Sequence, residues 1–213
     1  MRNQTNQAYQ IIRERILSGA YRPTESLTEL TLAQELAVSR NTIKKALLKL
    51  ASERLVVIEE NKRAVVRSFT IDEVLQYLRV REILEGLVIR EAIPLMKQSD
   101  FEEMESILAS MKEKLAAGEL KEYSQGNWRF HQVVYRLCPN LPAVEIVLSI
   151  KNQLNRYNVK TIFIQGRGAN SFAEHRAILD AIEKRDLDEA ERLIRMHVSN
   201  MREVLKKYHE LLF

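Results

Sequence analysis

The sequence predicts a mainly α-helical protein with two parts. The first is an N-terminal winged helix-turn-helix, α-helical with a small β-wing, over residues 1–70. The second is an all-α bundle of six or seven helices over residues 71–213. Residues 27–55 contain two short amphipathic helical patterns separated by a tight turn, whereas the chain after residue 70 shows successive helical patterns and no strand pattern. Short connections between those later helices favour an antiparallel bundle with its own core.

The N-terminal part begins with a predicted helix over residues 5–18. The first helix of the helix-turn-helix opens at Glu29 or Thr31, and the turn follows at residues 37–38. Ser39 is a natural N-cap for the second helix. That second helix has an apolar face at helical spacing, formed by Ile43, Ala46, Leu47 and Leu50.

The opposite face of the second helix carries side chains that suit base edges and phosphates. They are Arg40, Asn41, Thr42, Lys44, Lys45 and Lys49. Two β-branched runs follow at residues 55–58 and 64–66, and the turn before the second run contains Lys62 and Arg63. A Leu-rich helix pair with solvated lysines would look similar, but here the cations cluster on one helix and one turn. The pattern therefore predicts a protein that binds double-stranded DNA.

Charge is distributed unevenly along the chain. Residues 1–70 hold 12 Lys and Arg against 7 Asp and Glu, a net charge of +5, whereas residues 71–213 have a net charge of −1. Attraction to phosphate is the simplest use for the positive excess. The larger part has no reason to contact nucleic acid.

Cysteine content and hydropathy predict a cytoplasmic protein that does not associate with membranes. The single cysteine, Cys138, excludes an intrachain disulfide and suits a reducing compartment. The N-terminus has no apolar segment typical of a signal peptide, and no run approaches 18 apolar residues.

Capping patterns and breakers divide the second part into helices. Capping boxes open helices at residues 70 and 99, and further caps lie at residues 171 and 186. The predicted helices run from 71 to Pro94, over 99–117, 119–137 and 141–160, from 171 onward, and over 186–211, with a loop at 165–170.

Three of the four histidines lie on three different predicted helices and could meet inside the bundle. They are His131, His175 and His197, and Asn127 lies one turn before the first of them. Neutral imidazole is the commonest protein ligand of transition metals, so the three could form a metal site. The spacing does not require one, because a lone histidine on a partly apolar helix is more often only hydrogen-bonded.

The N-terminal part resembles the GntR family of bacterial transcription regulators. The shared pattern is Tyr9…Ile12-Arg13…Ile16-Leu17…Gly19…Tyr21…Pro23, then Leu27-Thr28-Glu29…Leu32-Ala33…Leu36…Val38-Ser39-Arg40. The second part resembles the FCD ligand-binding domain that defines the FadR subfamily. The residues that carry this second resemblance are Arg81…Leu84-Glu85, Phe130-His131, Asn140, Glu174-His175-Arg176-Ala177-Ile178, Asp186, Ala190 and His197.

The resemblance implies a cytoplasmic homodimer that binds a short palindromic operator, with the second helix in the major groove and the wing near the minor groove. It also implies that a small carboxylate effector in the helical domain alters DNA affinity. Many members of the family hold a divalent metal there through an Asp and three histidines. In this sequence the histidines would be His131, His175 and His197, and the metal zinc, nickel or manganese.

This sequence departs from the family at several positions. Asn127 replaces the Asp and loses its charge, so we expect weaker or altered metal binding. Lys44 replaces an Arg and exchanges a bidentate fork for a point charge, and Lys45 replaces a Glu and adds attraction to phosphate. Arg54 and Arg63 replace glycines, so the wing gains charge and loses backbone freedom.

These observations assign roles to individual residues. Four are expected to face base edges or nearby phosphates: Arg40, Asn41, Thr42 and Lys44. Four are expected mainly to neutralise phosphate: Lys45, Lys49, Lys62 and Arg63. Arg81 either grips an effector carboxylate or forms an ion pair with Glu85 one turn later, and the sequence leaves both interpretations open.

Other functions fit parts of the pattern. A metal-dependent hydrolase could use the three histidines, but no carboxylate is recognisably placed as a general base. In a DNA-binding dimer with a purely structural bundle, the histidines would bind nothing. Acyl-CoA binding, as in the protein that gives the subfamily its name, would not explain the histidines. We therefore predict a regulator, most simply a repressor, that is not an enzyme and is controlled by a small organic acid.

Overall fold

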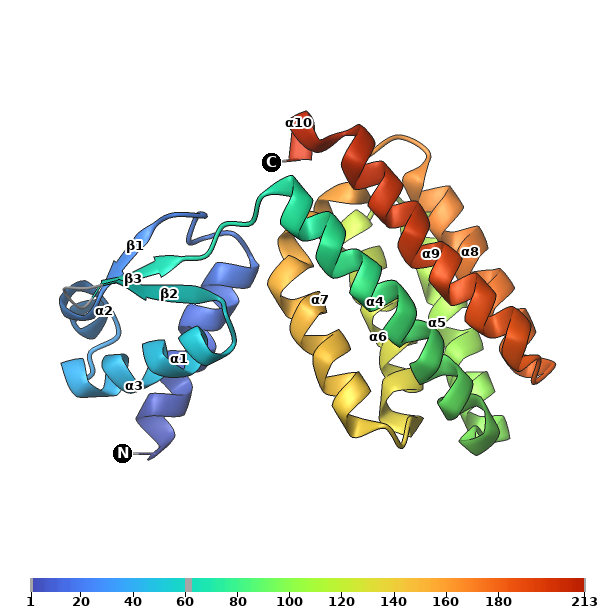
Figure 1. Ribbon diagram of the computed structural model, residues 1–213, viewed down its shortest axis with the longest axis horizontal. Helices are drawn as coiled ribbons and strands as arrows, with labels where there is room; N and C mark the ends of the chain where they lie inside the picture. Colours follow the sequence, from blue (N-terminus) through green and yellow to red (C-terminus); the bar gives the residue numbers. More distant parts are fainter. Residues whose placement is uncertain (1, 60–62, 213) are drawn as a thin grey trace. The chain divides into compact units, whose positions relative to one another are not determined.

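The computed structural model describes residues 2–59 and 63–212 (Figure 1). It divides into two compact units, residues 1–70 and 71–213. Each unit has its own cluster of buried apolar side chains. No helix among the described residues is long and apolar enough to span a bilayer.

The N-terminal unit is a helix-turn-helix with a wing, as the sequence predicts. Its helices are α1 (Arg2–Leu17), α2 (Glu29–Glu35) and α3 (Arg40–Ser52). Its sheet is formed by β1 (Ser26–Thr28), β2 (Val56–Glu59) and β3 (Arg63–Val66), antiparallel and in the order β1-β3-β2. Strand β1 was not predicted, because three residues are too few to show an alternating pattern. Its central residue Leu27 is buried and pairs with Ala64.

Side-chain caps fix where α2 and α3 begin. The hydroxyl of Thr28 accepts a hydrogen bond from the backbone N–H of Thr31 at 3.2 Å, so α2 begins at Glu29. Ser39 caps α3 in the same way through the N–H of Thr42 at 3.1 Å, which confirms the predicted cap. The predicted apolar face of α3 is also confirmed, since Ile43, Ala46, Leu47 and Leu50 are all buried.

The C-terminal unit is an all-α bundle (Figure 1). Its described helices are α4 (Ile71–Ala92), α5 (Gln98–Ala116), α6 (Leu120–Leu137), α7 (Leu141–Thr161), α8 (Arg167–Glu183), α9 (Leu187–Lys207) and the short α10 (His209–Leu212). Helix α4 packs along α9 and also contacts α7, while α5 packs between α6 and α8. The 3-10 turn Ile93–Leu95 follows α4 at the proline that was expected to end it.

Three predicted boundaries in this unit are wrong. Helix α8 begins at Arg167 and not at residue 171, because Gly166 adopts a left-handed conformation (φ 79°) from which the helix starts directly. Helix α5 begins at Gln98, since the side chain of Asp100 accepts the N–H of Lys97 at 2.8 Å. Helix α9 ends at Lys207, and the residues up to 212 form the separate α10.

Candidate functional site

Helix α3 presents exposed polar side chains on the face opposite its core. They are Arg40, Asn41, Lys44, Lys45 and Lys49, and Arg63 of β3 is exposed as well. Arg40 lies 3.7 Å from the carboxylate of Glu29, and the Lys49 ammonium lies 3.7 Å from the centre of the Tyr9 ring. Lys62 lies outside the described residues.

Thr42 differs from the other predicted DNA-facing residues of α3. Its side chain is only 8% exposed, and its hydroxyl lies 2.9 Å from the hydroxyl of Ser39, the N-cap. Thr42 therefore stabilises the first turn of α3 and, unlike its predicted DNA-facing neighbours, has little exposed surface for base edges or phosphates. The sequence could not show this, because an N3 threonine faces either the cap or the solvent.

Arg54, which follows α3, occupies a backbone position that favours glycine. Its φ is 58°, in the left-handed region. The glycine that the family pattern places here would adopt this conformation without the steric cost of a Cβ atom.

Three buried histidines from α6, α8 and α9 meet inside the C-terminal unit. One ring nitrogen from each of His131, His175 and His197 lies within 4.8 Å of the others. The side chains are 2%, 0% and 3% exposed. The convergence that the sequence allowed is therefore present.

Two carboxylates orient two of these imidazole rings. The Nδ1 atom of His131 lies 3.3 Å from a carboxylate oxygen of Glu85, and Nδ1 of His197 lies 2.6 Å from one of Glu174. A carboxylate at a buried imidazole holds the proton on the near nitrogen and leaves the lone pair on the far one. Such carboxylate partners are typical of histidines that bind metals.

His175 is oriented in the same way by the backbone. Its Nδ1 donates a hydrogen bond to the carbonyl oxygen of Ser171 at 2.6 Å, which leaves the lone pair on Nε2. Among the described residues, Nε2 of His131 and Nε2 of His175 are buried without a hydrogen-bond partner. Buried polar atoms are rarely left unpaired, so the donor set fits a metal ion.

Burial keeps the histidines neutral. Desolvation, followed by the nearby Lys151 ammonium, lowers the pKa of His131 to about 3. Desolvation, followed by the other two histidines, holds the pKa of His175 well below its usual value. The neutral imidazole is the form that binds a metal.

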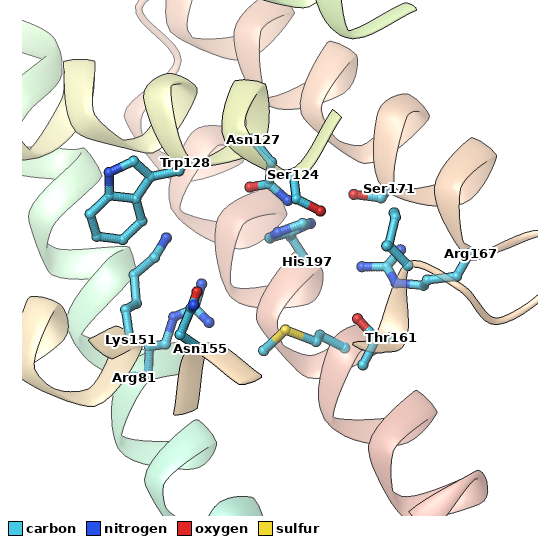
Figure 2. Close-up of a pocket in the computed structure, with 12 residues that line it drawn as sticks. Arg81, Ser124, Asn127, Trp128, Lys151, Asn155, Thr161, Arg167, Ser171 and His197 are labelled. Carbon is cyan, nitrogen blue, oxygen red and sulfur yellow. The ribbon is translucent and has the colours of Figure 1, made fainter. Parts of the chain in front are cut away.

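A pocket opens beside His197, one of the three histidines (Figure 2). It contains about 640 Å³ of empty space, part of it open to solvent. Three cationic side chains line it, Arg81, Lys151 and Arg167, together with His197 and Asn127. Figure 2 shows Arg81 and Lys151 on one side, Arg167 on the other, and His197 between them.

Both arginines are already paired with carboxylates. The Nε atom of Arg81 lies 2.5 Å from a carboxylate oxygen of Glu85, which confirms the ion pair that the spacing allowed. Arg167 donates to both carboxylate oxygens of Glu174, at 3.0 and 3.1 Å. Arg81 also lines the pocket, so the ion pair does not remove it from reach of a ligand.

Lys151 is the cation of the pocket that forms no ion pair with a described carboxylate. Its ammonium donates to the hydroxyl of Tyr135 at 3.0 Å and lies 5.1 Å from the ring centres of Trp128 and Tyr135. Burial, followed by the charge of Arg81, lowers the pKa of Lys151 to about 7.

The sequence prediction missed four charged residues of this site: Glu85 as a histidine partner, Lys151, Arg167 and Glu174. Lys151 offered a signal, as a lone cation within an apolar helical stretch. Arg167 offered none, because its segment was predicted to be a loop.

Comparison with known proteins identifies the family. Residues 76–200 match the model of the FCD domain, and residues 4–66 match that of the bacterial regulatory proteins of the gntR family. The chain belongs to the GntR family and has the winged-helix and FCD architecture of the FadR subfamily.

Named relatives agree with this assignment. The chain is 22% identical over 204 residues to the HTH-type transcriptional repressor RspR of Escherichia coli strain K12, covering 96% of this chain and 90% of that protein. It is 26% identical to the galactonate operon transcriptional repressor of the same strain, covering 89% and 91%. The solved structure of E. coli McbR/YncC shares the fold, with a TM-score of 0.81 at 16% identity over 96% of this chain and 98% of that one.

The chain is thus a DNA-binding transcription regulator. Its family and its named relatives are regulators, which sets aside the hydrolase hypothesis.

Proposed function

We propose that this regulator changes its DNA affinity when a small organic acid binds in the C-terminal pocket beside a divalent metal ion. One observation carries the proposal: three buried imidazoles converge, and two of them have Nε2 atoms with no described partner. The name of the galactonate operon repressor supports a hydroxy acid as the class of effector.

The metal would be held by His131, His175 and His197. Glu85 would keep the His131 ring oriented, and Glu174 would do the same for the His197 ring. When bound, the ion would act as a Lewis acid that attracts a carboxylate oxygen. Nitrogen ligands favour zinc or nickel over the harder manganese. Asn127 lines the same pocket and would offer a neutral carbonyl oxygen in place of a carboxylate.

Helix α4 connects the pocket to the DNA-binding unit along the chain. It begins at Ile71, directly after that unit ends, and it carries both Arg81 and Glu85. A ligand that binds Arg81, or a metal that acts on Glu85 through His131, would therefore act on this helix. Ligand binding would shift α4 between arrangements that differ in DNA affinity.

On the DNA side, the exposed face of α3 would enter the major groove. Arg40, Asn41 and Lys44 would contact base edges or nearby phosphates, and Lys45, Lys49 and Arg63 would neutralise phosphates. We keep Lys62 in the latter group as a prediction. A homodimer would read the two halves of a palindrome.

Elemental analysis tests the metal site most simply. We expect about one transition metal per chain in tag-free protein, lost in His131→Ala and retained in His209→Ala, which removes an exposed histidine. Protein that takes up no metal from zinc, nickel or manganese would refute the metal part of the proposal. A purely organic ligand would then have to be sought by calorimetry.

A further inference from the structure

We propose that the acid bound in this pocket carries two anionic groups, one beside the histidines and the second paired with Lys151. The inference rests on the proposed function, because it concerns the same pocket. It adds the chemical class of the ligand and the residue that selects for it.

The charges around the pocket do not balance without a ligand. Three buried cations line it, Arg81, Lys151 and Arg167. Two carboxylates face them, and each is already engaged by an arginine, Glu85 by Arg81 and Glu174 by Arg167. Among the described residues, one buried positive charge, that of Lys151, therefore remains without a carboxylate of its own.

A divalent metal at the histidines would add two more positive charges, and the neutral Asn127 offsets none of them. A ligand with one negative charge would leave a net charge of +2 in the buried site. A ligand with two would leave only +1. Uncompensated charge in a buried site is costly, so charge balance favours the dianion.

The geometry provides two separate positions for the two groups. Glu85 lies between them: one of its oxygens accepts from Arg81, and the other lies beside Nδ1 of His131. The free Nε2 of His131 is on the far side of that imidazole ring. Figure 2 shows Arg81 and Lys151 together on one side of the pocket, with His197 farther along it, so the two cations form a cationic corner separate from His197.

Lys151 is held in place for this role. It is 7% exposed, its ammonium donates to the hydroxyl of Tyr135, and the Trp128 ring flanks it. The lowered pKa of Lys151 agrees with a cation that lacks a partner. An anionic group placed beside it would raise that pKa and stabilise the charged form.

Matched pairs of sugar acids test the proposal. Gluconate and glucarate differ only at the last carbon, a hydroxymethyl group in the first and a carboxylate in the second. Threonate and tartrate form the same pair with four carbons. Titration calorimetry on the full chain, loaded with the metal that it retains, should show that one dianion binds at least about tenfold more tightly than its matched monoanion.

Substitutions at Lys151 assign that preference to one side chain. Lys151→Met keeps the volume but removes the charge, and we expect it to bind the two acids of a pair equally. Lys151→Arg should keep a preference for the dianion. Lys160→Met, which changes an exposed lysine on the same helix, should behave like the unmodified protein.

Each outcome decides the matter. Equal binding of both acids of every pair by the unmodified protein would overturn the inference and leave the proposed function standing. A preference that persists in Lys151→Met, in protein shown by its melting curve to be folded, would overturn the role of Lys151. Failure of every acid to bind would overturn both the inference and the proposed effector control.

Discussion

The recognition helix α3 and the pocket of the C-terminal unit use the same cationic side chains in opposite surroundings. Lys44 and Lys45 are exposed on α3, where their charges are solvated and cost nothing in the absence of DNA. Arg81 and Lys151 are buried, where each charge needs a partner. Surface cations therefore attract any phosphate, whereas the buried cations favour a ligand whose negative charge balances theirs.

The largest expected effect is on stability and compares two lysines. Lys151→Met should raise the free energy of unfolding of the ligand-free protein at pH 7 by about 1–4 kcal/mol, because it removes a buried charge that is paired with no carboxylate in the described part of the chain. Lys45→Met, on the exposed face of α3, should change it by less than about 0.5 kcal/mol. Chemical denaturation of both variants measures the difference.

The free energy of unfolding gained in Lys151→Met should increase as the pH falls from 10.5 toward 7. Burial lowers the pKa of Lys151 from 10.5 to about 7. Between these pH values the folded protein therefore holds the neutral amine, whereas the unfolded chain holds the ammonium. Near pH 10.5 burying Lys151 costs the folded state little stability. This cost grows as the pH falls toward 7, because the unfolded chain then binds the proton more readily than the folded protein does. A gain that increased with rising pH would contradict this account.

Two lysines of α3 separate specific from general DNA binding. Lys44→Ala should cost about 1–3 kcal/mol on the preferred sequence and relax the choice at one base pair. Lys49→Ala should weaken binding to all sequences and reduce the salt slope by about one phosphate contact. Fluorescence anisotropy on selected and random duplexes measures both, and equal loss for Lys44→Ala on the two duplexes would refute its role in base recognition.

Glu174→Gln tests the buried carboxylates. The uncharged amide oxygen accepts the hydrogen bond from His197 Nδ1–H more weakly than the carboxylate does, so metal affinity should fall about 10–100-fold. Glu113→Gln, at an exposed site on α5, should leave the metal affinity unchanged. Competition with a chelating dye gives the affinities. Unchanged metal affinity in Glu174→Gln would mean that this carboxylate serves only the ion pair with Arg167.

The smallest effect concerns the backbone after α2. Ala37 adopts a left-handed φ of 52°, and Ala37→Gly should stabilise the protein by about 0.5–1 kcal/mol, because the left-handed conformation suits glycine and the gain exceeds the added freedom of the unfolded chain. Arg185 has a similar φ of 53°, but its guanidinium donates to the carbonyl oxygens of Ile93 and Met96. Arg185→Gly should therefore destabilise the protein, and thermal melts of both variants check the contrast.

Caps and periodic apolar faces were predictable from the sequence, whereas the conformation of single turns and the long-range pairings were not. The cap at Ser39 and the apolar face of α3 depend on residues a few positions apart, so they appear in the sequence. The burial of Thr42 and the start of α8 at Arg167 depend on details of single turns that no periodicity shows.

The candidate site divides along the same line. The three histidines could be singled out by residue type, and the fold brings them together. Glu174 reaches His197 across 23 positions, and Lys151 reaches Tyr135 across 16. Such partners follow only from how helices pack, which is why the sequence pattern singled out the candidate metal ligands and missed the charged residues that surround them.

Control of DNA binding by the pocket can be measured on the full-length protein with one DNA duplex. A labelled duplex, selected from random DNA by the metal-loaded protein, is titrated with and without a saturating amount of glucarate or gluconate, whichever calorimetry shows to bind. We predict that the acid changes the Kd for DNA by about tenfold or more, and that this change disappears in His175→Ala. An unchanged Kd with the acid bound would contradict the account and leave the bundle without a role in regulation.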